Sequence, residues 1–284
     1  MPAAKDNVLR AITDDGAFRV IAARTTETVR RAVEAQSARG NTARYFGDLL
    51  TGAILFRETM APQLRVQGVL KGAFGSGSLV ADSHPSGKTR GLIQLPKDKD
   101  EIAIGNGAII QMMRTMPNGR IVQGMVEVPT EGGISRALMA YMQVSEQVVS
   151  MAAVGTLIDE EGVKSAGGYL VQLLPEVGRG PLMVMTERLR EFETIDSELG
   201  EGFSPQRLLD QILYGMPFTT LETSEVGFEC WCDELRVVSA LATLSRSDLE
   251  HLLSTGEILE INCEYCKREY RIPPARLQGL LESS

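Results

Sequence analysis

The alternation of apolar and polar residues at the start of the chain predicts two short strands, at residues 8–11 and 17–22. Asp14-Asp15-Gly16 lies between them and suits a hairpin turn, because glycine adopts a positive φ without strain. The apolar spacing then changes to three or four residues, which predicts helices at 25–36 and 43–60. The chain therefore begins with a mixture of strands and helices.

From residue 63 the period-two pattern returns, with glycine-rich turns between short apolar runs. Pro117-Asn118-Gly119 separates two of these runs and is typical of a hairpin. We expect strands at 64–68, 78–81, 91–95, 102–104, 108–116, 120–128, 148–158 and 165–174, and one helix at 134–144. Residues 1–177 are thus predicted to form an α+β core domain, a mixed α/β fold built on an antiparallel sheet.

Residues 178–224 have a different pattern and are predicted to form an amphipathic helical linker. Between 181 and 199, apolar residues recur every three or four positions while the other face is charged. The apolar stripe consists of Leu182, Met185, Leu189, Phe192, Ile195 and Leu199. A second helix is expected from Ser204, as its N-cap, to Gly215. Such helices need a surface to dock on, so we expect a unit of low stability that leans on the core domain.

Residues 225–284 are predicted to form a small third domain. Asp233 suits the N-cap of one helix, and Ser247 with Glu250 reads as the capping box of the next. A hairpin at 259–263 and 268–272 and a final helix from Pro273-Pro274 complete it. About 60 residues bury too little apolar surface to be stable alone.

Charge and composition narrow the partners and the chemistry. The 284 residues carry a net charge of −8, and residues 225–284 contribute 11 acidic and 6 basic side chains, a net of −5, so nucleic acid is disfavoured. The first seven residues are polar, and the longest apolar-rich stretch, 148–158, is far too short to span a membrane. We expect a soluble, cytoplasmic protein. With two histidines and no nucleophile, base and acid at recognisable spacing, we predict no catalytic residues and no enzyme activity.

All four cysteines lie near the end of the chain, as Cys230-Trp231-Cys232 and Cys263-Glu264-Tyr265-Cys266. Two closely spaced pairs deliver four thiolates to Zn²⁺ tetrahedrally, so we predict one zinc ion per reduced chain. His251 lies between the pairs and could replace a thiolate, although a solvated histidine is the simpler interpretation. Disulfides would need an oxidising compartment that nothing else indicates.

The spacing alone leaves the role of the metal open. Zinc keeps cysteines deprotonated, and thiolates are the oxidisable form, so the site could sense peroxide or hypohalous acid. A static zinc ribbon is favoured on spacing alone. It would belong to an adaptor protein that binds other proteins, or to an enzyme with a structural zinc.

Both cysteine pairs, their thirty-residue gap and the following Tyr270 resemble the zinc site of the Hsp33 family of redox-regulated chaperones. Residues 122–126, 141–147 and 167–175 also resemble segments of that family's core, in the family's order. The resemblance implies an ATP-independent holdase that binds unfolding proteins under oxidative stress. Zinc-bound, it is inactive. Oxidation forms disulfides within the pairs Cys230–Cys232 and Cys263–Cys266, releases zinc and unfolds the zinc domain; the active form is expected to be a homodimer.

In this reading the linker then loosens and exposes apolar surface. Our hypothesis for the client-binding surface is the stripe Met185, Leu189, Phe192 and Ile195.

Overall fold

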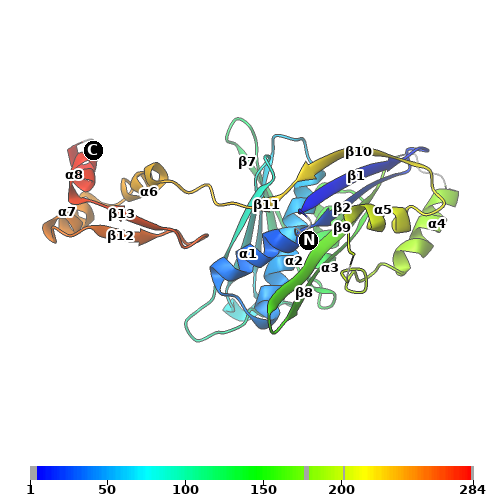
Figure 1. Ribbon diagram of the computed structural model, residues 1–284, viewed down its shortest axis with the longest axis horizontal. Coiled ribbons are helices and arrows are strands. Elements are labelled where there is room, and N and C mark those ends of the chain that lie inside the picture. Colours follow the sequence, from blue (N-terminus) through cyan, green and yellow to red (C-terminus); the bar gives the residue numbers. More distant parts are fainter. Residues whose placement is uncertain (1–4, 176–178, 201, 283–284) are drawn as a thin grey trace. The chain divides into compact units, whose positions relative to one another are not determined.

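The computed structural model describes residues 5–175, 179–200 and 202–282. It divides into two compact units, Met1–Glu229 and Cys230–Ser284. Figure 1 shows the elements of both units along the chain. In the described residues no helix combines the length and the apolar character needed to cross a membrane.

The first unit contains two sheets of antiparallel strands, as the sequence predicts. A five-stranded sheet has the order β10-β1-β2-β9-β8, and a six-stranded sheet has the order β11-β5-β4-β3-β6-β7, in which only the short β11–β5 pair is parallel. The strands are β1 (Asn7–Thr13), β2 (Phe18–Arg24), β3 (Arg65–Lys71), β4 (Ser78–Ser83), β5 (Lys88–Gln94), β6 (Ile109–Thr115), β7 (Ile121–Glu127), β8 (Ser150–Asp159), β9 (Gly162–Leu173), β10 (Phe218–Glu225) and β11 (Gly227–Phe228). The strand predicted at 102–104 is wrong, because this segment has no regular structure. Ile102 is buried in a loop, where its N–H donates to the Thr42 hydroxyl at 3.1 Å.

The helix α2 (Gly40–Glu58) is the centre of this unit. It packs against β3 and β4 of one sheet and against β8 and β9 of the other, so it is buried almost all round. Gly47 permits the close approach, because a Cβ there would lie 2.4 Å from the Thr156 hydroxyl oxygen on β8. The remaining helices of this core are α1 (Thr26–Gln36), α3 (Gly133–Tyr141) and the turns η1 (Ala73–Gly75) and η2 (Met142–Glu146). The α+β fold class predicted from the sequence is confirmed.

The predicted linker helices lie on the outer face of the five-stranded sheet and form a second core there. They are α4 (Arg179–Arg190) and α5 (Pro205–Ile212), and Ser204 caps α5 as predicted. The expectation of one helix from 181 to 199 is wrong, because residues 191–200 form turns that still bury their apolar side chains. The Tyr169 hydroxyl donates to the Phe192 carbonyl at 2.7 Å, which satisfies the backbone where the helix has ended.

Glycines in the sheet make room for this linker. Gly155 and Gly167 face each other on β8 and β9. A Cβ on Gly167 would meet the Phe203 ring at 2.4 Å, and one on Gly155 would meet Ile195 at 2.8 Å. The linker segment therefore lies directly on the sheet backbone at this point.

The prediction that the helical linker extends to residue 224 is wrong at its end, because Phe218–Glu225 form strand β10. The sequence pattern does not indicate β10 or β11. β10 is rich in threonine and mostly exposed, so it lacks the apolar alternation that marks a strand. It pairs antiparallel with β1 at the edge of one sheet, and β11 then pairs with β5 at the edge of the other. We call residues 218–228 the crossing segment, because they fasten the chain to both sheets just before Cys230.

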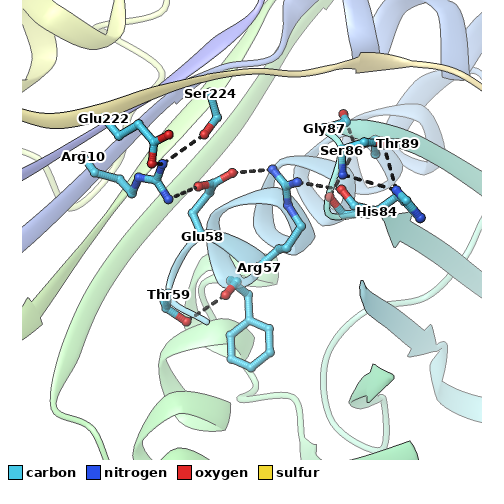
Figure 2. A network of polar contacts seen from close by, with 12 residues as sticks. Arg10, Arg57, Glu58, Thr59, His84, Ser86, Gly87, Thr89, Glu222 and Ser224 are labelled. Carbon is cyan, nitrogen blue, oxygen red and sulfur yellow. Dashed lines mark hydrogen bonds and ion pairs between the residues drawn. The ribbon is translucent and has the colours of Figure 1, made fainter. Parts of the chain in front are cut away.

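A polar network holds the crossing segment in place (Figure 2). Arg10 on β1 reaches Glu222 at 2.9 Å and Ser224 at 3.1 Å on β10, and it also pairs with Glu58 at 2.9 Å. Glu58 pairs with Arg57, which donates to the His84 carbonyl at 2.6 Å in the turn between β4 and β5. The network therefore connects β10, the end of α2 and the six-stranded sheet.

The second unit is small. It consists of α6 (Glu234–Leu241), α7 (Arg246–Ser254), the hairpin β12 (Leu259–Asn262) and β13 (Glu269–Ile272), and α8 (Pro274–Glu282). Among its described residues the fully buried apolar side chains are Leu249, Ile272 and Leu277. Asp233 caps α6 as predicted, but the N-cap of α7 is Ser245, whose hydroxyl accepts the N–H of Asp248, and not Ser247.

Asp48 is a carboxyl group buried inside the first unit. Burial raises its pKa to about 7, although the hydrogen bond from the Thr156 hydroxyl and the nearby Arg44 act in the opposite direction. Because this pKa lies above its value in the unfolded chain, the folded state binds more protons between the two values. Folding stability should therefore fall as the pH rises through that window.

We expect Asp48→Asn to remove this loss, since an amide can still accept the Thr156 hydrogen bond but cannot ionise. From about pH 5 to about pH 8 the melting temperature of the wild type should fall by several degrees more than that of the variant. Asp98→Asn, at an exposed loop position, is the matched control and should follow the wild type. Parallel pH profiles for Asp48→Asn and the wild type would contradict the assignment.

Candidate metal centre

The backbone of the second unit brings together two cysteine pairs that are thirty residues apart in the sequence. Cys230 and Cys232 lie in the extended segment between β11 and α6, and Cys232 directly precedes Asp233. The Asp233 carboxylate accepts the N–H of Arg236 at 2.8 Å and fixes the start of α6. The local fold of this segment thus sets the direction of the first pair.

Cys263 and Cys266 occupy the tip of the β12–β13 hairpin. The Lys267 N–H donates to the Cys263 carbonyl at 2.8 Å, and the Cys263 N–H donates to the Arg268 carbonyl at 2.9 Å. Lys267 has a positive φ of 58°, which lets the chain turn tightly after the second cysteine. This turn points both sulfurs to the same side.

The four sulfur atoms form one cluster. Their Sγ atoms all lie within 4.8 Å of one another, and none of the four cysteines forms a disulfide. The Sγ atoms of Cys230 and Cys263 are 3.8 Å apart, and those of Cys232 and Cys266 are 3.4 Å apart. A tetrahedral ion with metal–sulfur bonds of about 2.3 Å requires sulfur atoms about 3.8 Å apart, so the cluster fits a four-thiolate metal site.

The thiols of this cluster differ in their pKa values. Burial opposes ionisation of Cys232, but hydrogen bonds from the Tyr270 hydroxyl and from the neighbouring thiols outweigh it and lower its pKa to about 7. Burial and the bond to Cys232 raise the pKa of Cys266 to about 12. A metal ion must displace the remaining protons, so its affinity should increase with pH.

The other candidate residues lie elsewhere. His251 is exposed on α7 and does not belong to the cluster of described ligands. Met185, Leu189, Phe192 and Ile195 are in the first unit, between 1 and 6% exposed, and pack against the five-stranded sheet. As a client-binding surface these residues remain a prediction, because they are covered in this structure.

Sequence reasoning missed one contact of the site. Tyr270 lies on β13 opposite Ile261, and its hydroxyl donates to the Cys232 Sγ at 3.1 Å. Tyr270 entered the sequence analysis only as part of a family resemblance. An aromatic hydroxyl on the strand that follows the second pair is the signal that could have indicated it.

Comparisons with known proteins agree with this geometry. A family model described as "Hsp33 protein" matches residues 6–273. The chain is 28% identical over 289 residues to the 33 kDa chaperonin of Thermoanaerobacter sp. (strain X514), with 98% of each covered. It is 28% identical over 291 residues to that of Shouchella clausii, covering 99% of this chain and 98% of the relative. The crystal structure of the 33 kDa chaperonin (heat shock protein 33 homolog) of Thermotoga maritima superposes with a TM-score of 0.85 at 25% identity over 99% of both chains.

We expect a chelator, added with a thiol reductant to the full-length metal-loaded protein, to unfold the second unit and leave the first intact. The reason is that few apolar side chains are buried in the second unit. Trp231 is the single tryptophan and lies between two of the cysteines, so its fluorescence reports on the site. Amide exchange should rise from residue 230 onward and stay unchanged in the two sheets.

Cys263→Ser serves as the control and should resemble the chelated wild type before any chelator is added. If the stripped protein keeps its tryptophan spectrum and melts at the same temperature, the second unit does not depend on the metal.

Proposed function

Because this chain belongs to the Hsp33 family of chaperones, we propose that it is a redox-regulated, ATP-independent holdase that is inactive with zinc bound and active after oxidation. The observation that carries the proposal is the cluster of four cysteine sulfurs, in thiol form and within 4.8 Å of one another, in a unit whose described residues bury few apolar side chains. A change at the sulfurs then controls whether that unit is folded.

We propose that the ion is Zn²⁺. Four thiolates are the donor set of structural zinc sites, and the sulfur spacing fits their tetrahedral geometry. Structural zinc contributes about 10 to 16 kcal/mol of apparent binding free energy at neutral pH. This compares with about 5 to 15 kcal/mol for the net stability of a whole domain. When bound, zinc keeps the thiolates deprotonated and holds the unit closed.

Oxidation would remove the ligands. Two thiolates lose two electrons and form a disulfide, while hydrogen peroxide takes up the electrons and two protons and becomes two molecules of water. In the proposed switch the disulfides are Cys230–Cys232 and Cys263–Cys266. Each closes a loop of three or four residues and returns only about 2 kcal/mol or less. The exchange of zinc for two local disulfides is therefore strongly destabilising.

We propose that the linker is the part of the first unit that changes its structure when the switch operates. Its apolar side chains are buried on the five-stranded sheet, and ion pairs tie its turns to the core, Arg44 with Asp196 at 2.8 Å and Arg136 with Glu193. These pairs are about half exposed and contribute little. Loss of order in the second unit, combined with heat that weakens the linker's own contacts, would loosen the linker and uncover the stripe Met185, Leu189, Phe192 and Ile195 for unfolding clients. We further propose a cytoplasmic location, where the thiols stay reduced, and a homodimer in the oxidised state.

The decisive test treats the zinc-loaded protein with peroxide at elevated temperature and follows zinc release together with aggregation of a denatured client. We expect zinc to leave and client aggregation to be suppressed, and both effects to reverse with a thiol reductant. Release of zinc without suppression would refute the holdase. Retention of zinc throughout would favour an adaptor protein with a static zinc ribbon.

A photo-crosslinking phenylalanine analogue at Phe192 tests the client surface. We expect crosslinks to an unfolding client after oxidation and few before, because Phe192 is 6% exposed in this structure. Phe46, at the centre of the first unit and 0% exposed, is the matched control and should give none in either state. Efficient client capture without crosslinks at Phe192 would place the client surface elsewhere.

A further inference from the structure

One sulfur of the metal cluster, the Sγ of Cys232, accepts a hydrogen bond from a side chain that is not a ligand. The Tyr270 hydroxyl donates to the Cys232 Sγ at 3.1 Å, and the charge of the exposed Arg268 guanidinium acts on the same hydroxyl. The Cys266 Sγ lies 3.4 Å from the Cys232 Sγ. The contact at Cys232 is therefore made by a side chain that a single substitution can remove.

A hydrogen bond from a hydroxyl draws electron density away from a thiolate. It stabilises the sulfur in its resting state and makes it a weaker nucleophile toward an oxidant. The nearby guanidinium polarises the hydroxyl further, since hydrogen bonds in a chain strengthen one another. Tyr270 and Arg268 thus act on the reactivity of sulfur without being ligands themselves.

We propose that Tyr270 is a positioning residue that protects the Cys232 thiolate and so sets the oxidant level at which the Cys230–Cys232 pair reacts. This inference rests on the proposed redox function. The reaction concerned is attack of a thiolate on the O–O bond of a peroxide, which gives a sulfenic acid and, with one proton, water. The second thiolate of the pair then displaces the hydroxyl as a second water, with another proton, and the disulfide forms.

The same geometry explains why the contact comes from β13. Tyr270 lies four residues after Cys266, on the strand that follows the second pair, while its hydroxyl reaches Cys232 of the first pair. The hairpin therefore supplies two ligands, Cys263 and Cys266, and also a hydrogen bond that lowers the reactivity of a third ligand, Cys232. A donor placed in this way couples the reactivity of the first pair to the folded state of the hairpin.

The experiment compares full-length, zinc-loaded wild type with Tyr270→Phe at several peroxide concentrations. Zinc release is followed with a chelating dye, and the oxidised cysteines are identified by mass spectrometry. We expect Tyr270→Phe to release zinc roughly two- to tenfold faster, with earlier oxidation of the first pair. Arg268→Gln should act in the same direction but less. Tyr214→Phe, which removes a hydroxyl from a side chain 75% exposed in the first unit, should match the wild type.

Two further measurements separate positioning from a structural role. Zinc affinity in the absence of oxidant should stay close to that of the wild type. In the cobalt-substituted protein, the sulfur-to-metal charge-transfer band should move to lower energy in Tyr270→Phe, because the sulfur has lost a hydrogen bond. A large loss of zinc affinity would show that Tyr270 only supports the fold, and would overturn the proposal.

Release rates equal to those of the wild type would also overturn it, while the wild type's own response to peroxide would leave the redox function standing. If the wild type keeps its zinc under peroxide, the proposed function and this inference both fail.

Discussion

The convergence of four sulfur atoms within 4.8 Å is the constraint on which the proposed role of the C-terminal unit depends. The first unit needs no such device, since two sheets enclose α2 and bury a large apolar cluster around it. The second unit buries few apolar side chains among its described residues. In the proposed switch the two units therefore draw their stability from different sources, and chemistry at sulfur acts first on the second unit.

Burial of apolar side chains holds the linker on the sheet, and ion pairs contribute little. Its ion pairs to the core involve side chains that are about half exposed, whereas its apolar stripe is almost fully buried against the sheet. Gly155 and Gly167 bring the turns of the linker onto the sheet backbone. Apolar packing is not directional, unlike hydrogen bonding. A linker that is released therefore leaves a continuous apolar face exposed on the five-stranded sheet.

Much of the fold was predictable because burial imposes a period on the sequence. The hairpins around Asp14-Asp15-Gly16 and Pro117-Asn118-Gly119, and the apolar faces of the linker, are encoded locally and were recovered. Strand β10 escaped prediction because its side chains are exposed and its position depends on the distant β1.

The candidate site divides in the same way. The four cysteines are found from their spacing, whereas the Tyr270 contact requires the register of the β12–β13 hairpin. Buried Asp48 owes its raised pKa to packing between α2 and β8, which no local pattern reveals.

The crossing segment, residues 218–228, has a consequence for how the two ends of the switch communicate. It lies between the linker and the cysteines along the chain, and it is paired with β1 and β5 and anchored through Arg10. In the proposed switch, unfolding begins at Cys230. The crossing segment lies between Cys230 and α5 along the chain, and its strand pairs must break before the unfolding can extend to α5. Loss of the metal alone would then leave the linker's own contacts in place, and heat would be needed to break the strand pairs of the crossing segment and these contacts. The proposed switch would then respond to the coincidence of oxidant and heat, the condition under which other proteins unfold.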